Sequence, residues 1–335
     1  MLKGHGDDIY DHKRKITSNF SSNIYGKQDL SVLQRHLCSR IDLIRSYPES
    51  DAGSLARLLA EKHNVENGNV CVTNGATEAI YLLAQTFRNS RSNIIIPTFR
   101  EYEDACLIHN HKLSFFSSLN PIDFSQNQLI WICNPNNPDG NVYDIDFLIE
   151  KVEQYNNSIF IFDQSYEYFT KKQVWNIDQA VRYKNVILIH SMTKQYGIPG
   201  LRLGYITAHT DLIGKVEKVR MPWSVNGLAI EAGKFLIENE ISFPDSIHYL
   251  KEAERLQDAL SRVSGILIYP TRTHFFLCRL ENRKASDLKL WLIENYGILI
   301  RDASNFRGLD EHYFRIATQS PEENDLLVKA IKEWI

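Results

Sequence analysis

The residues with the clearest chemical potential follow a buried, strand-like run at 186–190. Ser191, Thr193 and Lys194 come directly after this run, and Arg202 follows eight residues after the lysine. A lysine at the end of a buried strand can act as an amine nucleophile, while hydroxyls and an arginine can donate hydrogen bonds to a phosphate dianion. The combination suits a Schiff base beside a phosphate. A bare S-x-x-K is more often a surface loop, but the full run SMTKQYGIPGLRLG favours the chemical interpretation.

Polar residues also end two other strand-like runs. Asp163 closes the run 158–162, where a buried carboxylate could keep a pyridine nitrogen protonated and make that ring an electron sink. Tyr166, and Asn137 in the turn after 129–133, could donate hydrogen bonds to a phenolate oxygen on the same ring. Simpler interpretations stay open, since Asp163 can be a strand-end cap and the segment NPNNPDG first indicates a turn.

A third candidate is the segment 73–78 (TNGATE), which begins a strongly apolar helical run. Gly75, Ala76 and Thr77 would present backbone N–H groups at a helix N-terminus, which is suited to bind phosphate, although a capping box explains the same residues. Phe99 follows another strand-like run and could stack on a flat ring, or belong to the core. No complete ATP-binding or dinucleotide-binding glycine motif is present, which disfavours ATP and NAD.

Alternating helices and short buried strands must position these residues. Continuously apolar runs predict strands covered by helices on both faces, at 93–97, 113–116, 129–133, 159–163, 186–191 and 203–207. Helical spacing predicts helices at 54–63 (with Ser54 as its cap), 77–87, 101–109 and 145–154. After Pro222 we expect helices at 227–240 and 244–263, strands at 265–269, 274–280 and 298–301, and a last helix at 321–334.

This order predicts an α/β fold, in which helices sandwich a mostly parallel central sheet, with a smaller α+β C-terminal domain. Ligands bind at the carboxyl ends of the strands in such sheets, so the polar residues that follow the strands are expected to meet there.

Composition narrows the classes of function. The chain has 335 residues with 38 basic and 41 acidic side chains, and this near-neutral charge argues against nucleic acid or anionic lipid as partner. No apolar run reaches the roughly 20 residues of a membrane span, and no signal peptide is recognisable, so we expect a soluble, cytoplasmic protein. Five scattered cysteines and eleven histidines without ligand spacing argue against a disulfide framework and against a metal site.

Taken together and in this order, the motifs resemble the fold type I pyridoxal 5′-phosphate enzymes of the aspartate aminotransferase class, over essentially the whole chain. The resemblance implies that Lys194 holds the cofactor as a Schiff base and that Asp163 pairs with the pyridine nitrogen. It places Asn137 and Tyr166 beside the phenolate, with Tyr166 as a catalytic residue, and Phe99 over the ring. The phosphate would be held by Gly75, Ala76, Thr77, Ser191, Thr193 and Arg202.

The resemblance also implies a homodimer with shared active sites. Tyr47, in the segment RSYP, matches the part of the family that reaches the cofactor of a neighbouring subunit. The family pattern divides the chain into an N-terminal arm with part of the small domain (1–45), a large cofactor-binding domain (46–222), and connecting helices with the small C-terminal domain (223–335). A transcriptional sensor built on this domain is disfavoured, because no basic helix-turn-helix extension precedes the family pattern.

Two subgroups of the family are similar to this chain, the histidinol-phosphate aminotransferases and the L-threonine-O-3-phosphate decarboxylases of cobalamin biosynthesis. The segments GHGDDIY, NFSSNI and MPWSVN resemble the decarboxylases. In both subgroups Arg315 matches the arginine for a substrate carboxylate and Arg301 the arginine for a substrate phosphate, and this pocket would be completed by Asn137, His5, Gly6 and Asn23. Decarboxylation is therefore the favoured activity.

Transamination of histidinol phosphate or a related amino acid is the alternative. Tyr166 is typical of the aminotransferases, and Gln164 and Asp139 depart from the pattern of the family. The loop after His5 also departs from the decarboxylase pattern.

Overall fold

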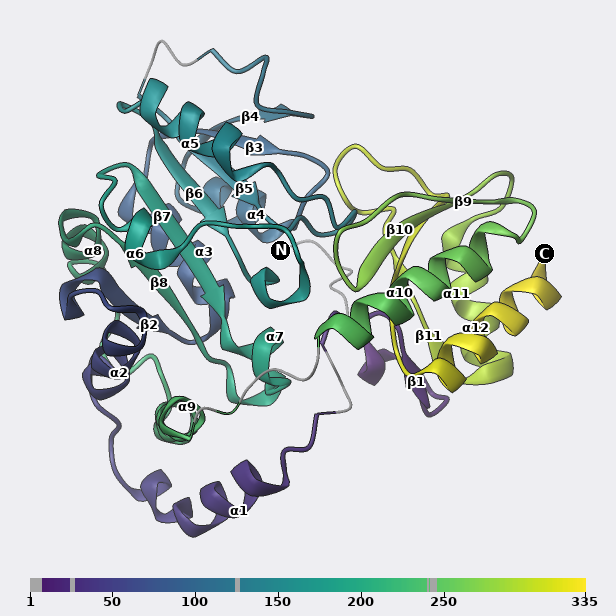
Figure 1. Cartoon of the computed structure of the whole chain (residues 1–335), viewed down its shortest axis with the longest axis horizontal. Helices are drawn as coiled ribbons and strands as arrows, with labels where there is room; N and C mark the ends of the chain where they lie inside the picture. Colours follow the sequence, from purple (N-terminus) through teal and green to yellow (C-terminus); the bar gives the residue numbers. More distant parts are fainter. Residues whose placement is uncertain (1–7, 25–27, 124–126, 240, 242–245) are drawn as a thin grey trace.

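The computed structural model describes residues 8–24, 28–123, 127–239, 241 and 246–335. In Figure 1, a large sheet covered by helices occupies the left, and a smaller unit formed by the last third of the chain lies on the right.

The large sheet has seven strands in the order β2-β8-β7-β6-β5-β3-β4. Their bounds are β2 Val70–Thr73, β8 Gly204–Ala208, β7 Val186–Ser191, β6 Ile159–Asp163, β5 Leu129–Cys133, β3 Arg91–Ile95 and β4 Lys112–Phe116. Strand β8 is antiparallel to both neighbours, and the other neighbouring strands are parallel to each other. The prediction of a mostly parallel central sheet is confirmed.

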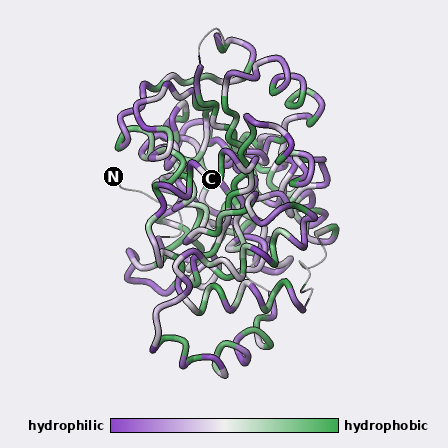
Figure 2. The backbone as a smooth tube through the Cα atoms, turned by 90° about the vertical axis from the view of Figure 1, so that its left-hand side faces the viewer, coloured by the Kyte–Doolittle hydropathy of each residue, from purple (hydrophilic) through white to green (hydrophobic). Residues whose placement is uncertain are grey.

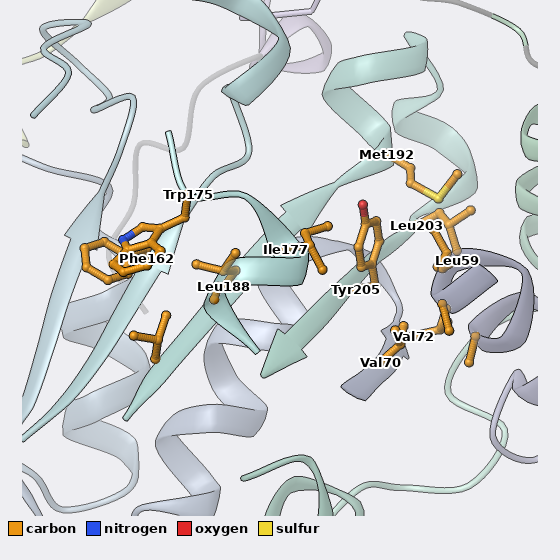
Figure 3. Packing of buried hydrophobic residues seen from close by; sticks show 14 of the residues in the cluster. Leu59, Val70, Val72, Phe162, Trp175, Ile177, Leu188, Met192, Leu203 and Tyr205 are labelled. Atoms are coloured by element: carbon orange, nitrogen blue, oxygen red, sulfur yellow. The ribbon is translucent and has the colours of Figure 1, made fainter. Parts of the chain in front are cut away.

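Both faces of this sheet are buried, which explains why its strands are continuously apolar. Successive residues of a strand point to opposite faces, so Phe160 and Phe162 belong to one hydrophobic cluster and Ile161 to another. Figure 3 shows the first cluster, where Phe162 lies beside Trp175. Figure 2 shows that hydrophobic residues concentrate in the interior of the molecule. The covering helices are α2 Gly53–His63, α3 Gly75–Thr86, α4 Glu101–Ile108, α5 Ile145–Gln154, α6 Ile177–Ala180, α7 Met192–Tyr196, α8 Thr210–Glu217 and α9 Gly227–Glu238.

The smaller unit is built on an antiparallel sheet in the order β12-β13-β10-β9. Its strands are β9 Ile266–Ile268, β10 Phe275–Leu280, β12 Arg301–Asp302 and β13 Tyr313–Ala317, and its helices are α10 Ser246–Ser261, α11 Ala285–Tyr296 and α12 Pro321–Trp334. Strand β1 (Ser18–Asn19) pairs in parallel with β11 (Ile298–Leu299). The N-terminal segment therefore joins this unit, and Phe20 lies in the same hydrophobic cluster as Phe276 and Phe314.

Several local predictions are wrong. Ser54 is not the cap of its helix: Ala52 precedes the helix in a left-handed conformation (φ 50°), and the backbone N–H of Ser54 donates instead to Glu49. The predicted strand 298–301 is two strands in different sheets, because β11 pairs with β1 while β12 pairs with β13.

Several elements were not predicted, among them the helices α6, α7, α8 and α11. The others are β1, β2, helix α1 (Ser31–Ser39), strand β13 and the 3₁₀ turns Ile9–Asp11, Ile41–Arg45, Asn67–Asn69, Glu167–Phe169 and Pro199–Leu201.

Candidate active site

A cavity of about 420 Å³ lies between the carboxyl ends of the parallel strands and the small C-terminal unit. Most predicted site residues line it: Asn23, Ala76, Thr77, Phe99, Asn137, Asp163, Tyr166, Ser191, Thr193, Lys194, Arg202, Arg301 and Arg315. Residues that sequence reasoning missed also line it, among them Ser21, Tyr102, Cys133, Ser165, Asn305 and Phe306.

Four predicted residues are not among those that line the cavity. Gly75 directly precedes Ala76 at the start of α3 but does not itself line the cavity. Tyr47 does not line the cavity; its side chain is 87% exposed, and its ring centroid lies 5.6 Å from that of Trp223. His5 and Gly6 lie outside the described residues.

Asp163 is a buried carboxylate with two hydrogen-bond donors. The Tyr102 hydroxyl donates to Oδ2 over 2.7 Å, and the backbone N–H of Ser165 donates to Oδ1 over 2.9 Å. Asp163 therefore acts as a strand-end cap and also lines the cavity, so the two interpretations are compatible. Burial, and then the nearby Asp163 charge, raise the pKa of Tyr102 well above its usual value, so this hydroxyl stays protonated as a donor.

Tyr102 was missed because a tyrosine within a predicted helix is typical of core packing. Its ring does pack in the core, 5.7 Å from the Trp131 ring. Its contact with Asp163 joins residues 61 positions apart, and no local pattern in the sequence indicates it.

A cradle of donors lies around the N-terminus of α3. Gly75 has a φ of +82°, and a Cβ atom there would lie 2.6 Å from Nη2 of Arg202, so only glycine lets the guanidinium approach this closely. Thr193 is buried, and its Oγ1 has no hydrogen-bond partner among the described residues. A buried hydroxyl without a partner is costly, so this atom fits a site that binds an acceptor such as phosphate.

The alternative explanation of this helix start, a capping box, is only partly formed. The side chain of Glu78 accepts from the backbone N–H of Asn74, but the Asn74 side chain makes no capping hydrogen bond. The N-terminal N–H groups of α3 therefore still lack a side-chain cap, which is consistent with an anion site.

Lys194 and Tyr166 face each other in the cavity. Nζ of Lys194 lies 5.9 Å from the centroid of the Tyr166 ring. The Tyr166 hydroxyl accepts a hydrogen bond from Nδ2 of Asn23 over 3.2 Å. Burial raises the pKa of Tyr166, so the hydroxyl keeps its proton and can donate it toward the cavity.

Two buried arginines, Arg301 and Arg315, line the cavity from strands β12 and β13 of the small C-terminal unit. They are directly paired on neighbouring strands β12 and β13. Arg315 donates to Oδ1 of Asn137 and to the backbone carbonyl of Ser21, and Arg301 donates to Oδ1 of Asn305 over 2.8 Å. Neither forms an ion pair with a carboxylate in the part of the chain that the structure describes.

Burial lowers the pKa of Arg315 to about 10, and the nearby charge of Arg301 adds to this effect. Both side chains stay cationic at neutral pH. Buried charges are costly unless they are paired, so this pair of cations fits a ligand with two anionic groups.

The arrangement fits pyridoxal 5′-phosphate. It offers an amine on Lys194, a carboxylate on Asp163 for a pyridine nitrogen, and phosphate donors at Thr193, Arg202 and the N-terminus of α3. Two other kinds of site were also sought. Among the residues that the structure describes, no group of three or more His, Cys, Asp or Glu side chains is placed to hold a metal ion. Within the same residues, no helix is both long enough and apolar enough to cross a bilayer.

Comparison with known proteins agrees with this geometry. The model of the family "Aminotransferase class I and II" matches residues 15–331. A solved structure of L-threonine-O-3-phosphate decarboxylase from Porphyromonas gingivalis is 41% identical, covers 95% of this chain and 99% of its own, and superposes with a TM-score of 0.92.

Each of the two subgroups is represented among the curated relatives of this chain. The threonine-phosphate decarboxylase of Salmonella typhimurium is 30% identical over 94% of this chain and 90% of its own length. A histidinol-phosphate aminotransferase of Caldanaerobacter subterraneus is 28% identical over 87% of this chain and 86% of its own length. The protein is therefore a pyridoxal 5′-phosphate-dependent enzyme that belongs to the class I and II aminotransferase family.

Proposed function

We propose that the protein decarboxylates L-threonine O-3-phosphate to 1-amino-2-propanol phosphate, a step of cobalamin biosynthesis. The observation that carries this proposal is the buried pair Arg301 and Arg315, directly opposite each other on β12 and β13. The substrate bears a carboxylate and a phosphate, which supply one anion for each arginine. The 41% identity with a decarboxylase of this substrate gives independent support.

The residues around Lys194 suit the binding of the cofactor. The Lys194 amine is the group that would hold it, and the phosphate would lie among Thr193, Arg202 and the N-terminus of α3. When bound, the cofactor supplies an electron sink for a carbanion at the substrate Cα. Asp163, held by Tyr102 and Ser165, would keep the pyridine nitrogen protonated.

The two arginines would decide which bond of the substrate breaks. The bond that is perpendicular to the ring is the one whose electrons can enter the ring. Arg315 would hold the carboxylate and Arg301 the phosphate, so together they would turn the Cα–carboxylate bond out of the plane. The carboxylate would leave as CO2, and Nζ of Lys194 would donate a proton to Cα. Decarboxylation consumes one proton overall, so Lys194 would take this proton up again from water.

Asn137 and Asn23 would support this orientation. Asn137 accepts from Arg315, and Asn23 donates to Tyr166, so a carboxylate on Arg315 would lie beside the proposed phenolate partners. His5 and Gly6 are proposed to complete the phosphate side of the pocket. This part of the proposal rests on the resemblance of segment 4–10 to the decarboxylases.

An aminotransferase is the second candidate, because a histidinol-phosphate aminotransferase is similar at 28% identity and Tyr166 is typical of that subgroup. In that reaction Lys194 would remove the proton from Cα. Both arginines would also suit this reaction, because the amino acid that completes a transamination bears a carboxylate. We place the decarboxylase first because a decarboxylase structure is 41% identical to this chain, against 28% for the aminotransferase.

We also propose that two copies form a homodimer in which Tyr47 reaches the cofactor of the other copy. Tyr47 is 87% exposed and does not line the cavity of its own chain. Trp223, whose ring lies beside Tyr47, is 52% exposed, and Met221, two residues before Trp223, is 71% exposed. The molecular mass in solution tests this proposal. A mass of a single chain at micromolar concentration would refute it.

The experiment that tests the activity incubates the holoenzyme with O-phospho-L-threonine and measures CO2 and 1-amino-2-propanol phosphate. Catalytic release of both supports the decarboxylase. No CO2, together with conversion of the cofactor to its pyridoxamine form by histidinol phosphate, would establish the aminotransferase instead. Arg315→Gln is expected to abolish CO2 release, and Arg301→Gln to raise the KM for the phosphorylated substrate.

A further inference from the structure

An ion pair joins the small C-terminal unit to helix α4, which covers the large sheet. Arg307 donates to both carboxylate oxygens of Glu103, from Nε over 2.9 Å and from Nη2 over 2.6 Å. Its guanidinium also lies 4.1 Å from the centroid of the Phe115 ring on β4. A bidentate arginine–carboxylate pair constrains direction as well as distance, so Arg307 has a defined position against the large domain.

The loop that bears Arg307 also bears the residues around Arg301. Asn305 accepts from Arg301, and the Phe306 ring centroid lies 5.4 Å from the Arg301 guanidinium. Arg301, Asn305 and Phe306 all line the cavity. Arg307 comes directly after Phe306, so its ion pair with Glu103 attaches this part of the loop to helix α4.

The backbone of the loop transmits that constraint. The N–H of Ala303 donates to the carbonyl of Tyr313, the N–H of Phe306 to Ala303, and the N–H of Leu309 to Phe306, over 2.9 to 3.1 Å. The loop is therefore closed on itself by short-range hydrogen bonds. Movement at Arg307 would move Phe306 and Asn305 with it.

The other end of the ion pair is equally well anchored. Glu103 lies in the first turn of α4, is 6% exposed, and also receives Nη2 of Arg100 at 3.2 Å. Tyr102, the preceding residue of the same turn, donates to Asp163. One helical turn thus connects the carboxylate proposed for the pyridine nitrogen to the loop around Arg301.

We propose that Arg307 and Glu103 are positioning residues that hold Arg301 at the correct distance from the cofactor site and thereby determine selectivity for phosphorylated substrates. This inference rests on the proposed role of Arg301 as the phosphate ligand. Neither residue of the pair lines the cavity. Their contribution is expected in the preference for phosphate and not in the chemical step.

The test compares a phosphorylated ligand with its unphosphorylated counterpart in Arg307→Gln, Glu103→Gln and the double variant. The absorbance of the holoenzyme cofactor is titrated with O-phospho-L-threonine and with L-threonine, and the ratio of the two dissociation constants is the readout. We expect each single variant to reduce the preference for the phosphorylated ligand roughly 10-fold, which corresponds to about 1.4 kcal/mol. The double variant should lose no more of this preference than either single variant does, because each single substitution already removes the same ion pair.

Arg255→Gln is the matched control. Arg255 forms a bidentate pair with Glu252 and is exposed to a similar extent as Arg307, 44% against 42%, but does not line the cavity. An unchanged ratio in Arg307→Gln, an equal loss for both ligands, or the same loss of ratio in Arg255→Gln would each overturn the inference.

The inference can be separated from the proposed function. If the wild type releases no CO2 from O-phospho-L-threonine, the decarboxylase proposal fails. The ratio measured with histidinol phosphate and histidinol then tests the positioning pair, since both activities require a phosphate on Arg301. If the variants keep the wild-type preference for histidinol phosphate over histidinol, the inference about Arg307 and Glu103 is refuted independently of the proposed function.

Discussion

Replacement of Tyr102 by phenylalanine tests how the site holds its buried carboxylate. The hydroxyl donates to Oδ2 of Asp163 over 2.7 Å, and the two side chains are 1% and 4% exposed. A hydrogen bond to a charged group contributes about 1.5–3 kcal/mol, which is roughly a 10- to 150-fold change in an equilibrium constant. Phenylalanine keeps the ring that packs on Trp131. Only the hydroxyl is lost, and the N–H of Ser165 remains as the other donor to Asp163.

The expected result is at least a 10-fold weaker affinity for pyridoxal 5′-phosphate, or a loss of kcat/KM of the same size. Cofactor affinity is measured by absorbance titration of the apoenzyme, and kcat/KM with the substrate that the wild type accepts. Tyr183→Phe is the control, because it removes a similar hydrogen bond to a carboxylate, Glu153 at 2.9 Å, from an exposed site. A change of less than 2-fold in both quantities for Tyr102→Phe would refute the reasoning.

Three further predictions concern catalysis, packing and pH. Lys194→Ala is expected to abolish the visible absorbance of the cofactor bound to the lysine; an unchanged spectrum would remove Lys194 from its proposed role. Gly204→Ala would place a Cβ atom 2.7 Å from the backbone N of Ala76 and the carbonyl oxygen of His190, so it is expected to reduce the free energy of unfolding by about 1–3 kcal/mol, as measured with urea. Burial lowers the pKa of His63 to about 4 from 6.5. The unfolded chain therefore binds this proton first as the pH falls, and stability is lost between pH 6.5 and 4. His63→Asn should reduce the loss between pH 7.5 and 5 by up to about 2 kcal/mol, and equal losses in both proteins would contradict the assignment.

The parallel sheet and the main site residues could be predicted because their signals are local. Continuous apolar runs such as 129–133 and 186–191 arise when a strand is covered on both faces, and the structure places strands at these positions. Polar residues directly after such strands meet at one edge, because parallel strands end on the same side. Asn137, Asp163 and Lys194 follow three different strands and line one cavity for this reason.

Local signals failed where neighbours decide the conformation. Residues 298–301 look like one strand, but pairing with β1 on one side of Ile300 and with β13 on the other divides them between two sheets. Ser54 has the residue type of a helix cap, but the helix already begins at Gly53. The backbone N–H of Ser54 donates to the side chain of Glu49. In both cases contacts with other segments overrode a local preference.

The sequence by itself determined the family, the cofactor and the residue types at the ends of the strands. Only the tertiary structure decided that Arg301 and Arg315 lie side by side without a carboxylate partner among the described residues, that Tyr102 holds Asp163, and that Arg307 reaches Glu103 from 204 positions away. The physical reason is range. Periodicity and strand-end chemistry act over a few residues, whereas hydrogen bonds and ion pairs join residues that only the folded chain brings together.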